Sequence, residues 1–174
     1  MGGYLLGPAA EAELPALAGL MVQSPLLARY RVEYGAALAS LEEAQAAGDT
    51  LLVAHVRAAD EGGAAPPTAG AASVSFAGFA WLSLAPRILG GAAYLRLLLV
   101  AEAYQGAGLG SQLFELVERT ARERGAKHLY LLATTDNHRA RQFYTRGGYR
   151  HVGDLPGLVW PDLDEALYHK PLLP

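Results

Sequence analysis

The stretch from Val100 to Gly125, VAEAYQGAGLGSQLFELVERTARERG, contains three closely spaced glycines followed by an amphipathic run. Gly106, Gly108 and Gly110 occupy alternate positions, and glycine allows positive φ angles and a close approach of a ligand to the backbone. Apolar residues then recur at the spacing of one helix face. These positions are Leu109, Leu113, Leu116, Val117 and Ala121. The first turn of this predicted helix exposes unpaired N–H groups at the positive end of the helix dipole, so the pattern indicates a phosphate or pyrophosphate site.

Two other glycine turns fit this stretch poorly. A P-loop requires Gly-Lys-Ser/Thr, whereas Gly110 is followed by Ser111 and Gln112. The dinucleotide-binding turn has the spacing Gly-x-Gly-x-x-Gly directly after its strand, whereas the third glycine here comes one residue early. Taken alone, the three glycines are equally consistent with a tight strand-to-helix turn that holds no ligand.

The composition limits the classes of protein to which this chain can belong. The 174 residues carry a net charge of −3 and include no cysteine. The small net charge argues against nucleic acid as the main partner, and the lack of cysteine excludes disulfides, thiolate metal sites and a cysteine nucleophile. No signal peptide is visible, and no apolar stretch approaches the roughly 20 residues that span a bilayer. We therefore expect a cytoplasmic protein with no membrane partner.

Outside the glycine turn, strand and helix patterns follow one another in the order βααβββαβαββ. Helical spacing is predicted at 11–23 and 26–48, and continuous apolar runs predict central strands at 92–101 and 126–134. The Gly-, Pro- and Ala-rich segment 59–72 is predicted to be a flexible hairpin loop, because strand-like sequence resumes directly after it. The order predicts one domain over residues 1–174, of the α+β (mixed α/β) class with a central sheet.

The pattern Gln-x-x-Gly-x-Gly, from Gln105 to Gly110, resembles the acetyl-CoA signature of the GNAT (GCN5-related N-acetyltransferase) superfamily. A second stretch, NHRARQFYTRGGY at 137–149, resembles a later motif of the same family, and the two occur in the family's order. The resemblance covers nearly the whole chain. It implies a mostly antiparallel mixed sheet of about seven strands, flanked by four helices, in which the fourth and fifth strands splay apart to admit the cofactor.

The resemblance implies acetyl-CoA as cosubstrate and no metal. Backbone amides between Gly106 and Ser111 would cradle the CoA pyrophosphate, with Gln105 shaping the loop. The strand end at 98–100 would pair with the pantetheine arm, and Asn137 would hydrogen-bond the pantetheine region, cap its helix, or do both. The positions carried over to cofactor binding are Leu98, Leu99, Val100, Gln105, Gly106, Ala107, Gly108, Leu109, Gly110, Ser111, Asn137 and Tyr144.

Tyr144 matches the family's general-acid position. A phenol near the thioester can donate a proton to the sulfur as it leaves, and a backbone N–H in the 97–99 segment can polarise the carbonyl. The alternative for Tyr144 is an ordinary buried tyrosine.

The general base is not evident, because neither predicted central strand carries the carboxylate that many relatives use. Glu33 and His55 are the candidates, and the imidazole of His55 has a suitable intrinsic pKa. Their alternatives are a solvated helix face and a hydrogen-bonded structural histidine, and deprotonation through water is a third route. The acidic residues Asp162, Asp164 and Glu165 could attract a cationic amine, but a solvated loop before the last strand is the favoured interpretation. His138, His151 and His169 lack metal-ligand spacing.

The sequence therefore predicts an N-acetyltransferase in which a primary amine attacks acetyl-CoA directly in a ternary complex. A small-molecule acceptor is favoured because segment 151–172 resembles the tail of small-molecule GNATs, where a loop between the last two strands helps close the acceptor site. The alternatives are a protein N-terminus or lysine as acceptor, and an acyl-CoA-binding sensor without turnover. Many relatives form homodimers, and nothing here decides between a monomer and a homodimer.

Overall fold

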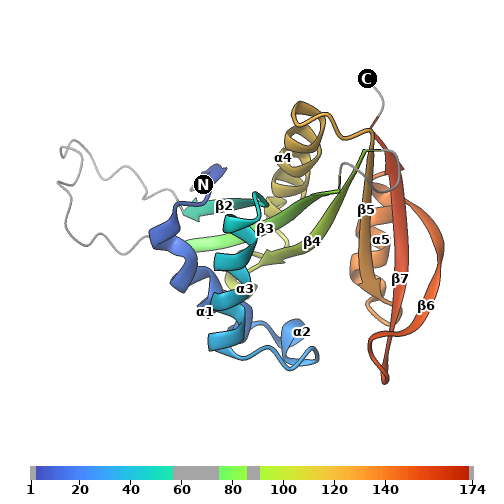
Figure 1. The fold of residues 1–174 in the computed structure, drawn as a ribbon, viewed down its shortest axis with the longest axis horizontal. Coiled ribbons are helices and arrows are strands. Elements are labelled where there is room, and N and C mark those ends of the chain that lie inside the picture. The colour runs from blue at the N-terminus through green and yellow to red at the C-terminus, as the bar shows by residue number, and fades with distance from the viewer. Residues whose placement is uncertain (1–2, 57–74, 86–90, 173–174) are drawn as a thin grey trace.

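The computed structural model describes residues 3–56, 75–85 and 91–172 (Figure 1). The predicted loop at 59–72 lies outside the described residues. The strands are β1 (Tyr4–Pro8), β2 (Thr50–Val56), β3 (Phe76–Ala85), β4 (Ala92–Val100), β5 (His128–Thr134), β6 (Arg150–Trp160) and β7 (Leu163–Pro171). The helices are α1 (Leu14–Gln23), α2 (Pro25–Ala28), α3 (Tyr34–Ala46), α4 (Leu109–Glu123) and α5 (His138–Arg146), with 3₁₀ turns at Glu11–Glu13 and Glu102–Tyr104.

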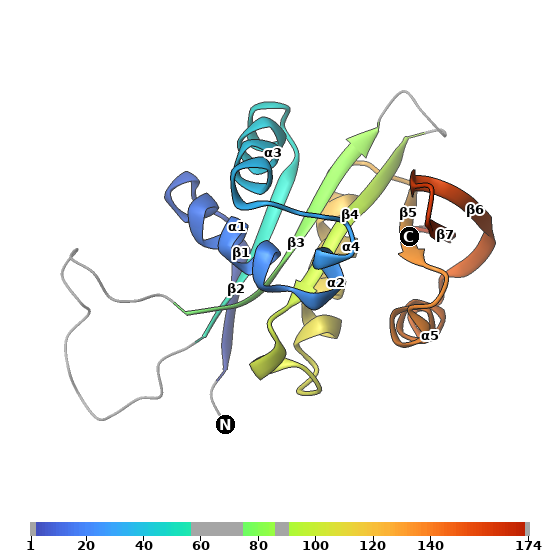
Figure 2. The ribbon, with the colours of Figure 1, turned by 90° about the horizontal axis from the view of Figure 1, so that it is seen from below.

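The seven strands form one sheet in the order β1-β2-β3-β4-β5-β7-β6. Every pairing is antiparallel except that of β4 with β5. Helices α1 and α3 cover one face of the sheet, and α4 and α5 cover the other (Figures 1 and 2). The predicted α+β class and the mostly antiparallel seven-stranded sheet are confirmed. The described residues contain five α-helices where four were expected.

The additional helix arises because the predicted helix 26–48 is broken. The chain leaves α2 at Arg29, and Arg31 adopts a positive φ of 56°. Glu33 then has extended backbone at the N-cap of α3. Leu27 is buried before the break, while Leu41 and its helical neighbours are buried after it, in one apolar cluster. The break lets the residues before it and the residues after it pack into the same apolar cluster. These tertiary contacts override the local preference for one continuous helix.

The pairing of β4 with β5 is short and ends in a gap. Only 92–95 of β4 pair with 128–131 of β5. The next residue, Arg96, is an extra residue in the β3–β4 ladder, because Leu82 pairs with Leu95 and Trp81 with Leu97. Such a bulge bends a strand and increases its twist. Beyond it β4 diverges from β5, as Figure 1 shows, and the expected splaying of these strands is confirmed.

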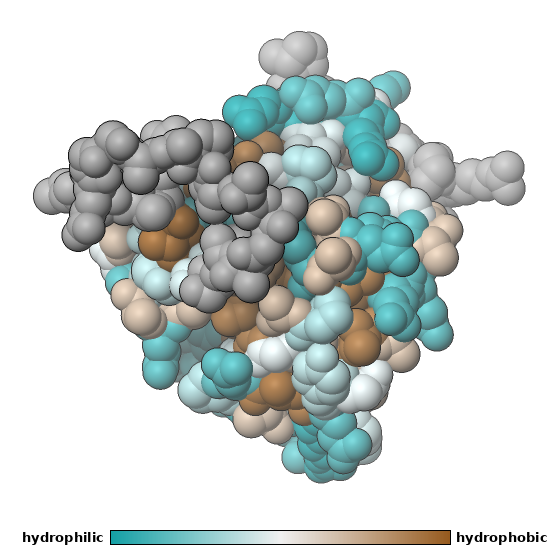
Figure 3. Space-filling view, turned by 90° about the vertical axis from the view of Figure 1, so that its left-hand side faces the viewer, coloured by the Kyte–Doolittle hydropathy of each residue, from teal (hydrophilic) through white to brown (hydrophobic). Residues whose placement is uncertain are grey.

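The face on the left-hand side of Figure 1 has hydrophilic residues interspersed with smaller apolar areas (Figure 3). Among the described residues, no helix is both long enough and apolar enough to cross a membrane.

Candidate functional site

A cavity of about 370 Å³ occupies the gap where β4 and β5 diverge. It is bordered by α1 and α2, by β3 and β4, by β5 and α5, and by β6 and β7. Its polar and aromatic lining residues are Tyr30, Trp81, Tyr94, Arg96, Thr134, Asn137, Tyr144 and Glu165. Apolar side chains, among them Met21, Leu27, Leu98 and Val159, complete the wall. An apolar cavity with a few convergent polar groups is typical of a small-molecule site.

The glycine turn presents a row of unpaired backbone amides at the start of α4. Gly106 and Gly108 have φ angles of 81° and 82°, and Gly108 is the helix N-cap. In the part of the chain that the structure describes, the N–H groups of 106–110 donate no hydrogen bond. The amide of Ser111, by contrast, donates to the Gly108 carbonyl at 3.1 Å. Of the amides predicted to hold an anion, those of 106–110 are unpaired, whereas that of Ser111 is already engaged.

Gln105 connects this turn to its surroundings. Its Nε2 donates to the Val100 carbonyl, and its Oε1 accepts from Nη1 of Arg139, both at 3.0 Å. The side chain thus holds the turn between the end of β4 and α5, in keeping with a loop-shaping role.

The end of β4 offers a free backbone edge. Beyond Leu95 the strand pairs only with β3, so the edge that faces β5 has no strand partner. Leu98 lines the cavity, whereas Leu99 is buried against the α1 and α3 side. The side chains therefore pack as core residues, while the β5-facing backbone edge from Leu97 onward has no strand partner, apart from the Val100 carbonyl, which accepts from Gln105.

Helix α5 contributes Tyr144 and its N-cap residue Asn137 to the cavity wall. Tyr144 is 8% exposed and its ring packs on Phe114, 5.5 Å away between centroids. Burial raises the pKa of the Tyr144 phenol, with a smaller contribution from Tyr94, so the hydroxyl stays protonated at neutral pH. Oδ1 of Asn137 accepts from the Ala140 amide at 3.1 Å, so Asn137 caps α5 and also borders the cavity.

The structure does not bring Glu33 or His55 to the cavity. Glu33 is exposed at the N-cap of α3, on the far side of the helix break. His55 lies on β2, where Nε2 is 3.3 Å from Glu13 and the ring lies 5.0 Å from that of Phe76. His55 thus has the contacts of a structural histidine.

A different carboxylate, Glu165, borders the cavity. It is 1% exposed, and its Oε1 accepts a 2.5 Å hydrogen bond from the Tyr30 hydroxyl. Burial raises the pKa of the Glu165 carboxyl, although the bond from Tyr30 lowers it in part. The sequence was interpreted here as a solvated loop, but β7 begins at Leu163 and turns Glu165 inward. Leu163, Asp164 and Glu165 are alternately buried and exposed in β7, but the sequence has two adjacent acidic residues here and carries no period-2 signal of this burial.

Three consecutive residues, Arg29 to Arg31, form a turn that closes one side of the cavity; we call it the 29–31 turn. Arg29 makes a two-pronged ion pair with Asp136 at 2.9 and 2.8 Å. Tyr30 binds Glu165, and the Arg31 guanidinium lies 4.4 Å from the Trp160 ring centroid. The turn therefore spans from α2 to β5–α5, β6 and β7. The expected loop before the last strand is instead mostly strand, and Val159 of β6 borders the cavity.

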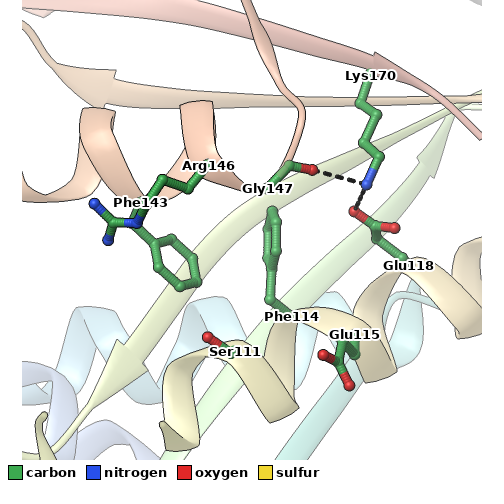
Figure 4. A pocket seen from close by; sticks show the side chains of 8 residues that line it. All are labelled: Ser111, Phe114, Glu115, Glu118, Phe143, Arg146, Gly147 and Lys170. Atoms are coloured by element: carbon green, nitrogen blue, oxygen red, sulfur yellow. Dashed lines mark hydrogen bonds and ion pairs between the residues drawn. The ribbon is translucent and has the colours of Figure 1, made fainter.

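A second hollow, of about 320 Å³, lies between α4 and α5 beside the glycine turn (Figure 4). Ser111 and Phe114 of α4 face Phe143 and Arg146 of α5 across it. At its other end Nζ of Lys170 donates to Glu118 at 2.6 Å and to the Gly147 carbonyl at 2.8 Å, which ties β7 to both helices. Among the described residues, no group of three or more potential metal ligands is clustered.

Residues 49–149 match the model of the acetyltransferase (GNAT) family. The chain belongs to the GNAT acetyltransferase family. The matched range holds both the glycine turn and Tyr144, whereas the 29–31 turn and Glu165 lie outside it.

Individual relatives agree with this assignment. A mycothiol acetyltransferase from Jonesia denitrificans is 39% identical over 84 residues, which are 46% of this chain and 26% of that protein. The chain spans less than half the length of the curated relatives it matches. Ard1 from Thermoplasma volcanium superposes with a TM-score of 0.75 at 19% identity, over 98% of this chain and 99% of that one. The structure of yncA from Salmonella typhimurium with its cofactor acetyl-CoA superposes with a TM-score of 0.70 at 17% identity, over 98% of this chain and 94% of that one. These two structures share the GNAT fold with this chain.

Proposed function

We propose that this protein transfers an acetyl group from acetyl-CoA to the primary amine of a small molecule. One observation carries the proposal: the cavity between the diverging strands is lined by the buried phenol of Tyr144, and the free amides of 106–110 follow shortly after the end of the same strand β4. A set of free amides and an open strand edge suit the binding of an acyl-CoA, and a proton donor suits the release of its thiol. The family match and the acetyl-CoA of yncA support this choice of cosubstrate.

The residues present fit an anionic cosubstrate. Five consecutive unpaired amides at a helix N-terminus suit a pyrophosphate, because each can donate a hydrogen bond and the helix dipole adds positive potential. The free edge of β4 between Leu97 and Val100 has backbone groups for the amides of a pantetheine arm. Acetyl-CoA would supply the activated acetyl thioester.

The chain supplies the rest of the chemistry. A neutral amine attacks the thioester carbonyl, so that a C–N bond forms and the C–S bond breaks. The Tyr144 hydroxyl donates a proton to the departing sulfur and recovers one from the acylated nitrogen. Backbone N–H groups at the free edge of β4 would stabilise the negative charge that develops on the carbonyl oxygen.

The acceptor is a small molecule in this proposal, because the 29–31 turn closes the cavity on the acceptor side. A sensor without turnover is less well supported, since it would need neither a protonated phenol nor a buried carboxylate beside the cavity.

Calorimetric titration of the purified protein with acetyl-CoA tests the proposal, with NAD and ATP as controls. We expect acetyl-CoA alone to bind. Saturation at about 100 times Kd would stabilise the protein by roughly 2.7 kcal/mol, visible as a higher Tm. Binding of NAD without acetyl-CoA, or of none of the three, would contradict the proposal.

A further inference from the structure

We propose that Glu165 is the residue that binds the acceptor amine as an ammonium ion and takes its proton, and that Tyr30 positions it. This inference rests on the proposed function and names the acceptor class, a primary alkylamine that arrives with its positive charge.

Two residues with buried, unpaired polar atoms occupy facing positions on β5 and β7 beside the cavity. Glu165 on β7 is directly opposite Thr134 on β5, so the two side chains share one face of the sheet. Among the described residues, neither Oε2 of Glu165 nor Oγ1 of Thr134 makes a hydrogen bond within 3.5 Å, although the Thr134 hydroxyl lies near enough to the Asp136 carboxylate to help lower its pKa; both residues border the cavity. A buried polar atom without a partner costs stability, and such atoms commonly await a ligand or water. Here both can accept a hydrogen bond from the same donor group.

The chemistry of these atoms selects a cation with several N–H donors. A primary ammonium has three, so it can donate to Oε2 of Glu165 and to Oγ1 of Thr134 at once. A carboxylate buried in an apolar cavity also favours a positive partner by charge. Apolar side chains of Met21, Leu27 and Val159 border the same space and would contact an alkyl chain.

The proton balance of the reaction also requires such a residue. An alkylammonium has a pKa near that of lysine, about 10.4, so it enters charged and must lose one proton before its nitrogen can attack. The Glu165 carboxylate accepts this proton. Tyr144 then gives one proton to sulfur and recovers the second amine proton, so the net proton resides on Glu165 and leaves to water with the products.

The groups around Glu165 suit a proton acceptor. The titratable and charged groups that face it are Tyr30 and Arg29 from the 29–31 turn, Tyr94 from β4 and Asp136 from the segment before α5. Burial makes the carboxylate more basic than a solvated one, while the Tyr30 hydroxyl fixes Oε1 and leaves Oε2 for the ligand.

Binding of propylamine to the CoA-saturated protein at neutral pH tests the recognition step, with propan-1-ol as the neutral probe of the same shape. Propylamine should bind measurably tighter than propan-1-ol. Glu165→Gln should weaken propylamine by about tenfold or more and leave propan-1-ol unchanged. Thr134→Val should weaken it by a smaller factor. Glu42→Gln, an exposed carboxylate on α3, is the matched control and should behave as wild type.

The proposal is overturned if wild type does not bind propylamine, if it binds both probes alike, or if Glu165→Gln binds as tightly as wild type or no more weakly than Glu42→Gln. Acetyl-CoA titration of the same preparations distinguishes failure of the proposed function from failure of this inference. If wild type does not bind acetyl-CoA, the proposed function is contradicted. If it binds acetyl-CoA but does not discriminate propylamine from propan-1-ol, only this inference is contradicted.

The pH profile of propylamine acetylation, followed as thiol release, tests the proton transfer. Wild type should show an acidic limb, where Glu165 becomes protonated and activity falls. Tyr30→Phe removes a hydrogen bond that favours the charged carboxylate, so this limb should move to higher pH. A limb that stays in place in Tyr30→Phe and persists in Glu165→Gln would overturn the assignment.

Discussion

Tyr30 and Glu165 are 135 positions apart in the chain, yet the Tyr30 hydroxyl donates a 2.5 Å hydrogen bond to Oε1 of Glu165. The bond joins the turn after α2 to β7, across the gap between β4 and β5. It leaves Oε2 buried and unpaired beside the cavity. A bond of this kind stabilises the closed side of the cavity and at the same time orients a reactive carboxylate.

Glu165→Gln should raise thermal stability at neutral pH. The folded-state pKa of Glu165 is raised, so its favourable contribution is complete below the unfolded carboxyl pKa of about 4.3 and is lost as the pH rises through the folded value. Gln does not ionise and has no such loss. The Tm difference between variant and wild type should therefore grow from pH 4 to pH 8. A difference that is flat or shrinks with pH would show that Glu165 is not buried as described.

Tyr144→Phe should lower kcat by about 10²-fold or more while acetyl-CoA binding stays intact, because only the proton donor is removed. Tyr149→Phe is the matched control. Tyr149 is also buried and bonds Glu118 at 3.2 Å, but it does not border the cavity. Its loss should lower Tm and leave kcat near the wild-type value. Equal kcat losses in the two variants would indicate a general packing effect.

Gly108→Ala should weaken acetyl-CoA binding. A Cβ at Gly108 meets nothing within 4 Å, so the effect comes from the positive φ of 82°, which costs an L-residue about 1–2 kcal/mol and distorts the amide cradle. Gly48→Ala is the control, because Gly48 has φ 83°, equally open surroundings and a place after α3. Both variants should lose similar stability, and only Gly108→Ala should raise the Kd for acetyl-CoA. A raised Kd in both would point to general destabilisation.

Arg29→Ala should raise the KM for the amine several-fold without changing the Kd for acetyl-CoA. The Arg29–Asp136 pair holds the 29–31 turn over the acceptor side, while the amide cradle lies at the start of α4. Both side chains are well exposed, at 41% and 60%, so the pair should contribute little to Tm. The KM effect should shrink at high salt, which screens the pair in wild type. A change in acetyl-CoA affinity instead would contradict this division of the site.

Glu33→Gln and His55→Gln should both keep kcat within a few-fold of wild type, because neither side chain borders the cavity. His55→Gln should lower Tm, since His55 packs on Phe76 and pairs with Glu13. Steady-state kinetics with propylamine would measure kcat for both variants, and thermal unfolding would measure Tm. A loss of two orders of magnitude in either variant would move the base away from Glu165.

Local patterns in the sequence predicted the part of the site that is built from one contiguous stretch. The helix after Gly108 follows from its apolar spacing, and Leu109, Leu113, Leu116, Val117 and Ala121 are all buried as predicted. The positive φ angles of Gly106 and Gly108 follow from glycine at those positions. Asn137 at the N-cap of α5 is likewise confirmed.

The helix predicted at 26–48 shows where such patterns fail. Leu, Ala and Glu favour helix on both sides of residues 29–32, and the Tyr30 and Val32 between them lower helix propensity only slightly, too little to mark a break before Glu33. The break at Arg31 is stabilised by contacts of the 29–31 turn with Asp136, Glu165 and Trp160, all more than 100 positions away.

There is a physical reason why the sequence predicted some features and only the tertiary structure decided others. Gly106 to Gly110, the helix that follows and the Tyr144 motif are short-range features, whose backbone angles and amphipathic faces are set by residues within a few positions. The acceptor side of the cavity, by contrast, depends on residues that are far apart in the sequence. A carboxylate at Glu165 is an ordinary polar residue until pairing with β5 places it opposite Thr134, and until the broken helix brings Tyr30 to it. Burial and hydrogen bonding create its reactivity, and both exist only once distant strands and turns have come together.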